Sequence, residues 1–265
     1  MLLSLVLSAL FGVLVSLVAN YFVMTVKWFA TLRFSSNSFF EMNGLSFAPI
    51  LWLFLAVFTL YFVRKIFGID RWHGPADAVY ACHRTDNELD LKKGIGSTFA
   101  ALVSLCGGAP VGQYGPLVNF GATIGSFVSE FLKARAFTPE ILMGCGVAAA
   151  ISAGFHAPIA GIIFAHEAVL RHFSLRALVP IAVASATSAA FGNWAFGGSA
   201  LFSIDVVAPE LLPLMPALII SGIAFGIAAL VYMKLIFFFA AVPPKYKLGY
   251  LPFALSAALI TGIFG

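Results

Sequence analysis

The sequence predicts an all-α, multi-pass membrane protein whose helical bundle contains short, broken and re-entrant helices. Of its 265 residues 61% are hydrophobic and 10% are charged, whereas a soluble domain carries about 25% charged residues. The mean hydropathy is +1.00. Several apolar segments are also too short to span a bilayer, and they meet at breaks rich in Gly and Pro. Irregular backbone at membrane depth is tolerated only inside protein or beside a watery cavity, so we expect a transport pathway.

The charge pattern favours a membrane surface as partner and argues against nucleic acid. The net charge of +4 comes from 15 Lys and Arg that are scattered singly or in pairs, as in loops that face anionic lipid. Cys82, Cys106 and Cys145 form no CxxC pair, so we expect neither a disulfide framework nor a zinc site. The segment Leu2–Met24 lacks a basic start and exceeds a signal-peptide core, which favours a retained membrane helix.

Two ordinary spanning helices are expected first, at Leu2–Val26 and Phe47–Val63, each followed by basic residues. The break at 71–75 then precedes a helix at Ala76–His83 that is too short to cross, with proline in its first turn. Thr138 is expected to cap a later helix that opens with Pro139. The remaining apolar segments are Gly94–Leu105, Leu117–Leu132, Ile141–Ser152, Ile159–Leu170, Leu175–Phe191, Leu211–Val242 and Leu248–Phe264.

The loop formed by Gly112, Gln113, Tyr114, Gly115 and Pro116 is the most informative stretch of the sequence. Its backbone N–H groups, at the start of a helix, would face a cavity. Such groups carry partial positive charge and stabilise an anion without a charged side chain. The alternative interpretation is a simple break between helices that allows close packing. Two GxxxG spacings, Gly121 to Gly125 and Gly222 to Gly226, predict close packing of helices within the chain, with a dimer contact as the alternative.

Two long motifs make the chain resemble the CLC chloride channels and transporters. Residues 107–125, GGAPVGQYGPLVNFGATIG, are similar to the family pattern GG(x)xGREGPxVxxGAxxG. Residues 144–167, GCGVAAAISAGFHAPIAGIIFAHE, are similar to G(A)AAGxAAAFNAPxAGxxFxxEE. Order, spacing and flanking apolar runs agree from about Leu2 to Gly265.

The resemblance implies one transmembrane region over residues 1–265 within a fold of two inverted halves. Residues 1–205 would form the first half and residues 206–265 the opening helices of the second. The family's second filter motif, of GxFxP type, and its later chloride-site tyrosine have no counterpart here. The ending on Ile-Phe-Gly after an apolar helix is typical of truncation.

The resemblance also implies roles for single residues. The family's gating glutamate falls on Tyr114, and its inner proton-transfer glutamate falls on Ala168, while Glu167 matches the first residue of that pair. A phenol stays neutral at physiological pH, so the sequence predicts passive anion movement, with chloride as the ion and Tyr114 as plug or gate. When the family's GSGxP segment is aligned with residues 71–75, its serine corresponds to Trp72. With a gap in the alignment, Gly74 corresponds to one of its glycines. Trp72 is otherwise interpreted as an interfacial belt residue.

Three function hypotheses from different classes follow. The first is a passive anion channel, and the second is a proton-coupled chloride antiporter that uses Glu167 or His166. The third is a nonconducting chain that serves only in assembly. The His166-Glu167 pair is no zinc motif, because Leu170 occupies the place of the second histidine, and Glu167 could equally pair with Arg171. We expect no enzyme activity, metal or cofactor.

Cellular context is expected from charge and from the resemblance. Arg64, Lys65 and Arg71 follow the second helix, which favours an inside N-terminus in the plasma or inner membrane. The resemblance implies a homodimer that uses the helices at Ile159–Leu170 and Leu175–Phe191.

Overall fold

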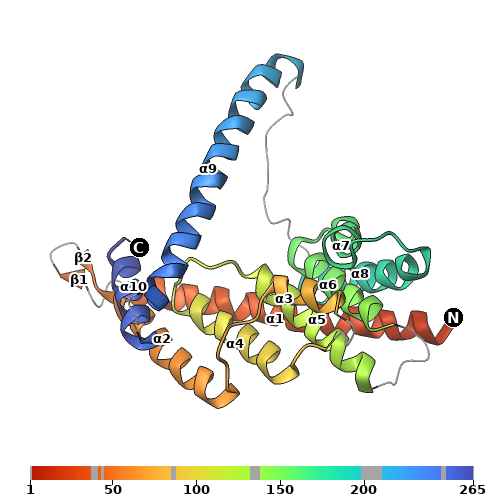
Figure 1. Cartoon of the computed structure of the whole chain (residues 1–265), viewed down its shortest axis with the longest axis horizontal. Helices are drawn as coiled ribbons and strands as arrows, with labels where there is room; N and C mark the ends of the chain where they lie inside the picture. The colour runs from red at the N-terminus through yellow and green to blue at the C-terminus, as the bar shows by residue number, and fades with distance from the viewer. Residues whose placement is uncertain are drawn as a thin grey trace. The chain divides into compact units, whose positions relative to one another are not determined.

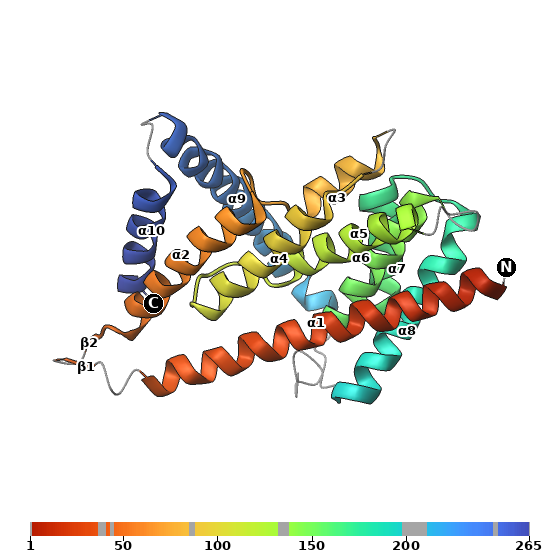
Figure 2. The same ribbon diagram turned by 90° about the horizontal axis from the view of Figure 1, so that it is seen from below.

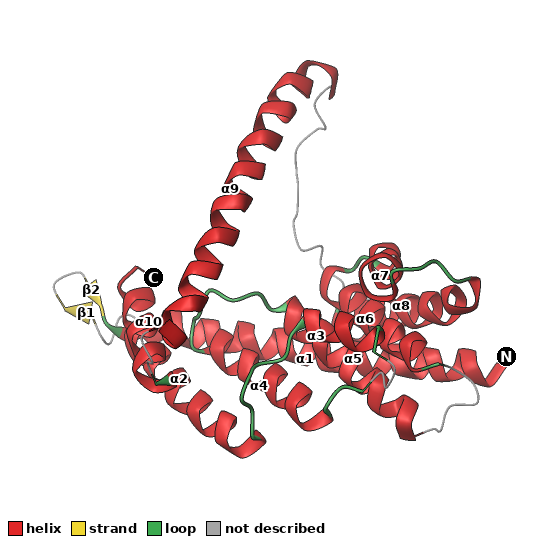
Figure 3. Ribbon diagram, in the orientation of Figure 1, coloured by secondary structure: helices red, strands yellow, loops and turns green. Residues whose placement is uncertain are grey.

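The computed structural model describes residues 2–36, 41–42, 45–84, 88–131, 138–197, 211–245 and 249–264. These residues are almost entirely helical (Figures 1 and 3). The chain divides into two compact units, Met1–Leu201 with Ala258–Gly265, and Phe202–Ala257. The elements are α1 (Leu2–Ser36), β1 (Glu41–Met42), β2 (Leu45–Ser46), α2 (Ala48–Phe67), α3 (Pro75–Cys82), α4 (Leu91–Cys106), α5 (Tyr114–Phe131), α6 (Pro139–Phe155), α7 (Pro158–Phe164), the π-helix η2 (Ala165–Leu170), α8 (Leu175–Phe196), α9 (Leu211–Lys245) and α10 (Tyr250–Phe264).

Helix α6 forms the centre of the first unit. Every residue from Ile141 to Gly154 is buried, because the helix is apolar on all sides and packs against α1, α5, α7 and α8. Figure 2 shows α1 running along the bundle beside α8, in agreement with the many contacts between these two helices.

Small residues bring α5 and α6 together, as expected. Gly121 lies directly against the backbone of Gly146, and a methyl group built on Gly125 would come within 2.5 Å of the Leu142 carbonyl oxygen. Backbones can approach this closely only where side chains are absent. The prediction that Gly121 and Gly125 serve intramolecular packing is therefore confirmed. For Gly222 and Gly226 it is wrong within the described residues, because a methyl group built on either meets nothing within 4 Å.

The mixture of long and short helices is confirmed as well. Within the described ranges, α1, α2, α8 and α9 are long and apolar enough to cross a membrane. Helix α3 has 8 residues, too few to cross a bilayer of about 30 Å. Apolar side chains are exposed along α9 of the second unit, as expected of a helix that faces lipid or further protein.

Some expected boundaries were wrong. Helix α1 continues to Ser36 rather than ending near Val26, because Lys27 and Arg33 occupy its last turns without breaking it. Helix α5 begins at Tyr114, three residues before the expected Leu117, since a proline in the first turn costs no intrahelical hydrogen bond. The expected boundary between halves at residue 205 lies outside the described residues.

Candidate anion site

Two helix starts meet inside the first unit. Helix α3 begins at Pro75 after the N-cap residue Gly74, and α5 begins at Tyr114. A methyl group built on Gly115 would lie 3.5 Å from Cγ of Pro75. The structure therefore brings together the loop at residues 112–116 and the segment around Gly74, which the sequence analysis had singled out separately.

Helix α4 fixes both starts through two adjacent hydroxyl groups. The backbone N–H of His73 donates to Oγ of Ser97 at 2.9 Å. Oγ1 of Thr98 lies 3.2 Å from the carbonyl oxygen of Pro116 and 3.0 Å from that of Gly94. Ser97 and Thr98 are both buried. Sequence reasoning missed them, although two neighbouring hydroxyls in an apolar segment are a usable signal, because buried polar groups need partners.

The two helix starts differ in the N–H groups that they offer. The first N–H groups of a helix have no intrahelical partner, and proline has none at all. At α5, the candidates for binding an anion are therefore the N–H groups of Tyr114 and Gly115. At α3, the N–H of Gly74 donates to Oδ2 of Asp77 at 2.8 Å. This N–H group is therefore already hydrogen-bonded within the protein and is not offered to an anion.

The ring of Tyr114 packs against the end of α6. Its centroid lies 4.0 Å from that of Phe155, with the rings tilted by 38°. A methyl group built on Gly154 would lie 2.5 Å from Cδ1 of Tyr114, so this glycine makes room for the ring. Helix α6 ends directly afterwards, at His156, whose backbone is left-handed with φ of 53°. The gate expected at Tyr114 is thus packed against the α6–α7 junction.

The remaining predicted residues are spread around the unit. Gly112 is exposed, Gln113 is half-buried, and Trp72 is half-buried in the loop between α2 and α3. Glu167 is exposed on η2, whereas His166 beside it is 1% exposed and stacks on Phe173 with centroids 4.6 Å apart.

His166 has a buried imidazole whose hydrogen bonds are incompletely satisfied. Among the described residues, its Nε2 has no hydrogen-bond partner, and its Nδ1 lies 3.4 Å from the carbonyl oxygen of His172. π-Helical turns occur frequently at functional sites. The structure does not place Glu167 or His166 among the residues that surround the start of α5.

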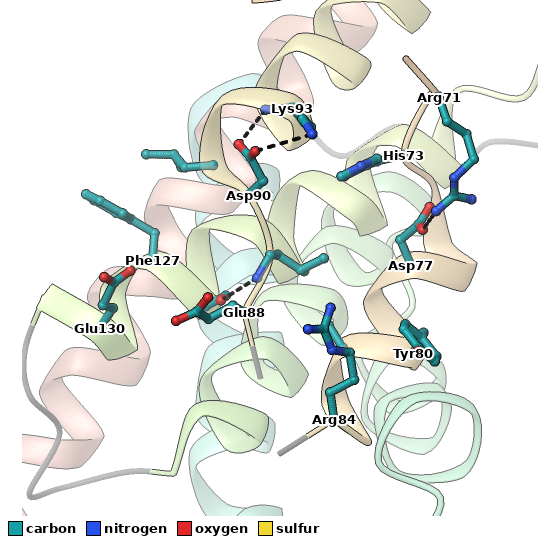
Figure 4. Close-up of a pocket in the computed structure, with 14 residues that line it drawn as sticks. Arg71, His73, Asp77, Tyr80, Arg84, Glu88, Asp90, Lys93, Phe127 and Glu130 are labelled. Atoms are coloured by element: carbon teal, nitrogen blue, oxygen red, sulfur yellow. Dashed lines mark hydrogen bonds and ion pairs between the residues drawn. The ribbon is translucent and has the colours of Figure 1, made fainter. Parts of the chain in front are cut away.

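A polar cavity of about 520 Å³ adjoins the start of α3 (Figure 4). Arg71 and Asp77 form an ion pair across it, and Nζ of Lys93 lies 3.9 Å from Oδ2 of Asp90. His73 lines this cavity and also bonds to Ser97 at the helix starts. Sequence reasoning missed the cavity, because its lining comes from α3, α4, α5 and their connections.

Comparison with known proteins identifies the family. The sequence profile described as Voltage gated chloride channel matches residues 55–265. The chain is 30% identical over 135 residues to the putative chloride channel protein ClcB-like of Ralstonia nicotianae, covering 49% of this chain and 32% of the relative. It is 26% identical over 282 residues to the H(+)/Cl(-) exchange transporter ClcA of Vibrio vulnificus, covering 98% of this chain and 57% of the relative. The chain thus spans only part of the length of these relatives.

Solved structures give the same fold. A slow cyanobacterial Cl-/H+ antiporter matches with a TM-score of 0.80 and 19% identity, covering 98% of this chain and 63% of that one. A CLC-type fluoride/proton antiporter matches with a TM-score of 0.79 and 22% identity, covering 99% and 64% respectively. Together with the profile match over most of the sequence, this fold shows that the chain belongs to the voltage-gated chloride channel (CLC) family of integral, multi-pass membrane proteins.

Proposed function

We propose that this chain takes part in transmembrane anion transport coupled to proton movement, with the anion bound at the start of α5. The observation that carries the anion site is the meeting of the two helix starts, where Gly115 packs against Pro75. Helix N-termini stabilise anions through unpaired N–H groups and the helix dipole. The start of α5 offers unpaired N–H groups, whereas at α3 the N–H group of Gly74 is hydrogen-bonded to Asp77.

Relatives support exchange over passive conduction. The relative that matches 98% of this chain is named an exchange transporter of protons and chloride, and the two structural neighbours are described as proton antiporters. The sequence alone favoured passive movement, because Tyr114 and Ala168 occupy the family's two carboxylate positions. We therefore infer that a proton, where it moves, uses groups other than these two residues.

Passive conduction stays as the second candidate, and Tyr114 is the observation that favours it. A phenol held against Phe155 can obstruct a path but does not replace the carboxylate that the family uses to exchange protons. Relatives named voltage-gated ClC-type chloride channels, such as ClcB of Yersinia pseudotuberculosis, match 60% of this chain at 25% identity. A chain that serves only in assembly is the third possibility.

Simultaneous recording of chloride and pH around liposomes tests the proposal. Purified protein is reconstituted into chloride-loaded vesicles, and potassium with valinomycin holds the membrane voltage at zero. We expect chloride efflux with an opposite movement of protons that raises the external pH. Chloride efflux at constant pH would establish the passive channel instead, and folded protein without any efflux would establish the nonconducting chain. Empty vesicles are the control, and fluoride replaces chloride in a parallel series.

We propose a second copy of the chain as partner, alongside membrane lipid. The observation that supports it is a set of exposed apolar side chains on α7, α8 and the segment between them: Ile159, Ile163, Phe173, Leu175 and Val179. Contiguous exposed apolar surface marks a site of protein or lipid contact. The mass of the detergent-solubilised protein by light scattering tests this, with twice the chain mass expected and a single chain mass contradicting it.

A further inference from the structure

The polar cavity beside α3 is lined by charged and polar side chains. Its volume of about 520 Å³ is ample for water, whose share of liquid volume is about 30 Å³ per molecule. Its charged lining has both signs, with the acids Asp77, Glu88, Asp90 and Glu130 and the bases Arg71, Arg84 and Lys93, and Tyr80 adds a phenol. Two acids are paired with bases, so the lining forms no anion trap. Mixed charge suits a water-filled vestibule.

His73 is the residue through which this cavity reaches the helix starts. Its imidazole lines the cavity and is labelled there in Figure 4. Its Nδ1 is enclosed by protein and, within the described part of the chain, has no hydrogen-bond partner. A buried polar nitrogen without a partner is costly, and a catalytic role is one of the reasons for which native structures retain such a group.

The position of His73 places it next to the candidate anion site. It directly precedes Gly74 and Pro75, and Pro75 packs against Gly115 at the start of α5. Its backbone is fixed by Ser97 of α4, whose neighbour Thr98 contacts Pro116. Two neighbouring residues of α4 therefore fix the backbone of His73 and the start of α5.

We propose that His73 relays protons between the cavity and the anion site, which makes it the proton-handling group of the exchange proposed above. The inference rests on that proposed function. Imidazole is suited to the task, because it is the side chain that changes charge near neutral pH and has two distinct nitrogens. One ring nitrogen accepts a proton from a hydronium ion in the cavity, which leaves water, and the N–H bond at the other nitrogen breaks as its proton moves on toward the anion site. The ring returns to its neutral form, so the charge is balanced.

Charged groups from several segments line the cavity together with His73. From its own segment they are Arg71 and Asp77, with the phenol of Tyr80; from the following link and α4 they are Arg84, Glu88, Asp90 and Lys93; from α5 it is Glu130. The Arg71–Asp77 ion pair keeps the Asp77 carboxylate occupied.

Paired proton and chloride measurements on His73→Gln test the relay. Glutamine keeps a hydrogen-bonding side chain but does not titrate, and His83→Gln is the matched control, since His83 is an exposed histidine just beyond the other end of α3. We expect His73→Gln to lose at least about tenfold in proton movement, as general acid–base groups typically contribute, while chloride efflux is retained. His83→Gln is expected to match the wild type in both.

Chemical rescue separates proton transfer from a structural role. In His73→Ala, imidazole added to the bath is expected to enter the cavity and restore proton movement, which a purely structural loss would not allow. Unchanged coupling in His73→Gln, or absence of rescue in folded His73→Ala, would overturn the relay while leaving proton exchange intact. Absence of proton movement in the wild type would instead overturn the proposed exchange itself and the relay with it.

Discussion

Tyr114 combines two properties that are rarely found together at the start of a helix. Its backbone N–H belongs to the group that a helix leaves unpaired, while its ring is held against Phe155 and Gly154 at the end of α6. An aromatic contact of this kind contributes about 0.5–1.5 kcal/mol beyond the area that it buries. The ring is therefore held at the start of α5 by a contact of modest strength, which would suit the gate that we predict.

Removing the ring is expected to raise anion flux. Tyr114→Ala deletes the contact with Phe155 but leaves the backbone N–H groups in place. Because the aromatic contact amounts to about 1 kcal/mol, we expect chloride efflux to increase several-fold, measured in liposomes. Tyr61→Ala, which changes an exposed tyrosine on α2, is the control and is expected to leave efflux unchanged. Equal efflux from both variants and the wild type would contradict the gate.

A carboxylate in the same place is expected to introduce acid sensitivity. In Tyr114→Glu the ionised side chain would compete with the anion for the N–H groups at the helix start. Protonation at low pH removes the negative charge, so efflux should rise as the pH falls toward the ordinary range of a glutamate. A series of efflux rates from pH 4 to pH 7 checks this, and a pH profile identical to that of the wild type would count against it.

Residues at the site were only partly predictable. The loop at 112–116 was predicted because Gly and Pro disrupt helices in ways that a sequence displays directly, and Gly74 was predicted through the resemblance to the family's GSGxP segment. Ser97, Thr98 and His73 were missed, because their importance comes from contacts between α4 and segments far from it in the chain. No local sequence pattern distinguishes a Ser or Thr hydroxyl that bonds only to its own helix from a hydroxyl that also bonds to a neighbouring segment.

At the scale of elements, the contact between α5 and α6 holds the site in place. Helix α5 carries Tyr114 at its start, and α6 carries Gly154 and Phe155 at its end, so the relative position of the two helices sets how the Tyr114 ring packs. The backbones touch at Gly121 and Gly146, where any side chain would force the helices apart. Small residues at such crossings were predictable from spacing alone, whereas the extension of α5 back to Tyr114 was not.

A methyl group at this crossing is expected to destabilise the bundle. In Gly146→Ala the new Cβ meets the backbone of Gly121, which cannot move without shifting a whole helix. Overpacking of this kind costs about 1–3 kcal/mol, so the thermal unfolding temperature in detergent should fall. Gly222→Ala is the matched control, because a methyl group there meets nothing within 4 Å. Equal unfolding temperatures for the two variants would refute the tight crossing.

At the scale of the whole molecule, composition and two motifs were enough to predict the class of protein and its family. The excess of apolar residues and the Gly- and Pro-rich breaks follow from the bilayer as solvent, and they are visible without a structure. The mode of transport was not predictable in the same way. It depends on where protons bind, and in this chain both expected carboxylate positions hold other residues, Tyr114 and Ala168.

The reversal potential across a planar bilayer tests the central claim of coupled transport most directly. With a fixed chloride gradient, the pH on one side is changed and the voltage of zero current is recorded. A coupled exchanger is expected to shift its reversal potential with the pH gradient, because protons and chloride then carry the current together in one transport cycle. A reversal potential that stays at the chloride equilibrium value at every pH gradient would contradict the account and leave a passive anion channel.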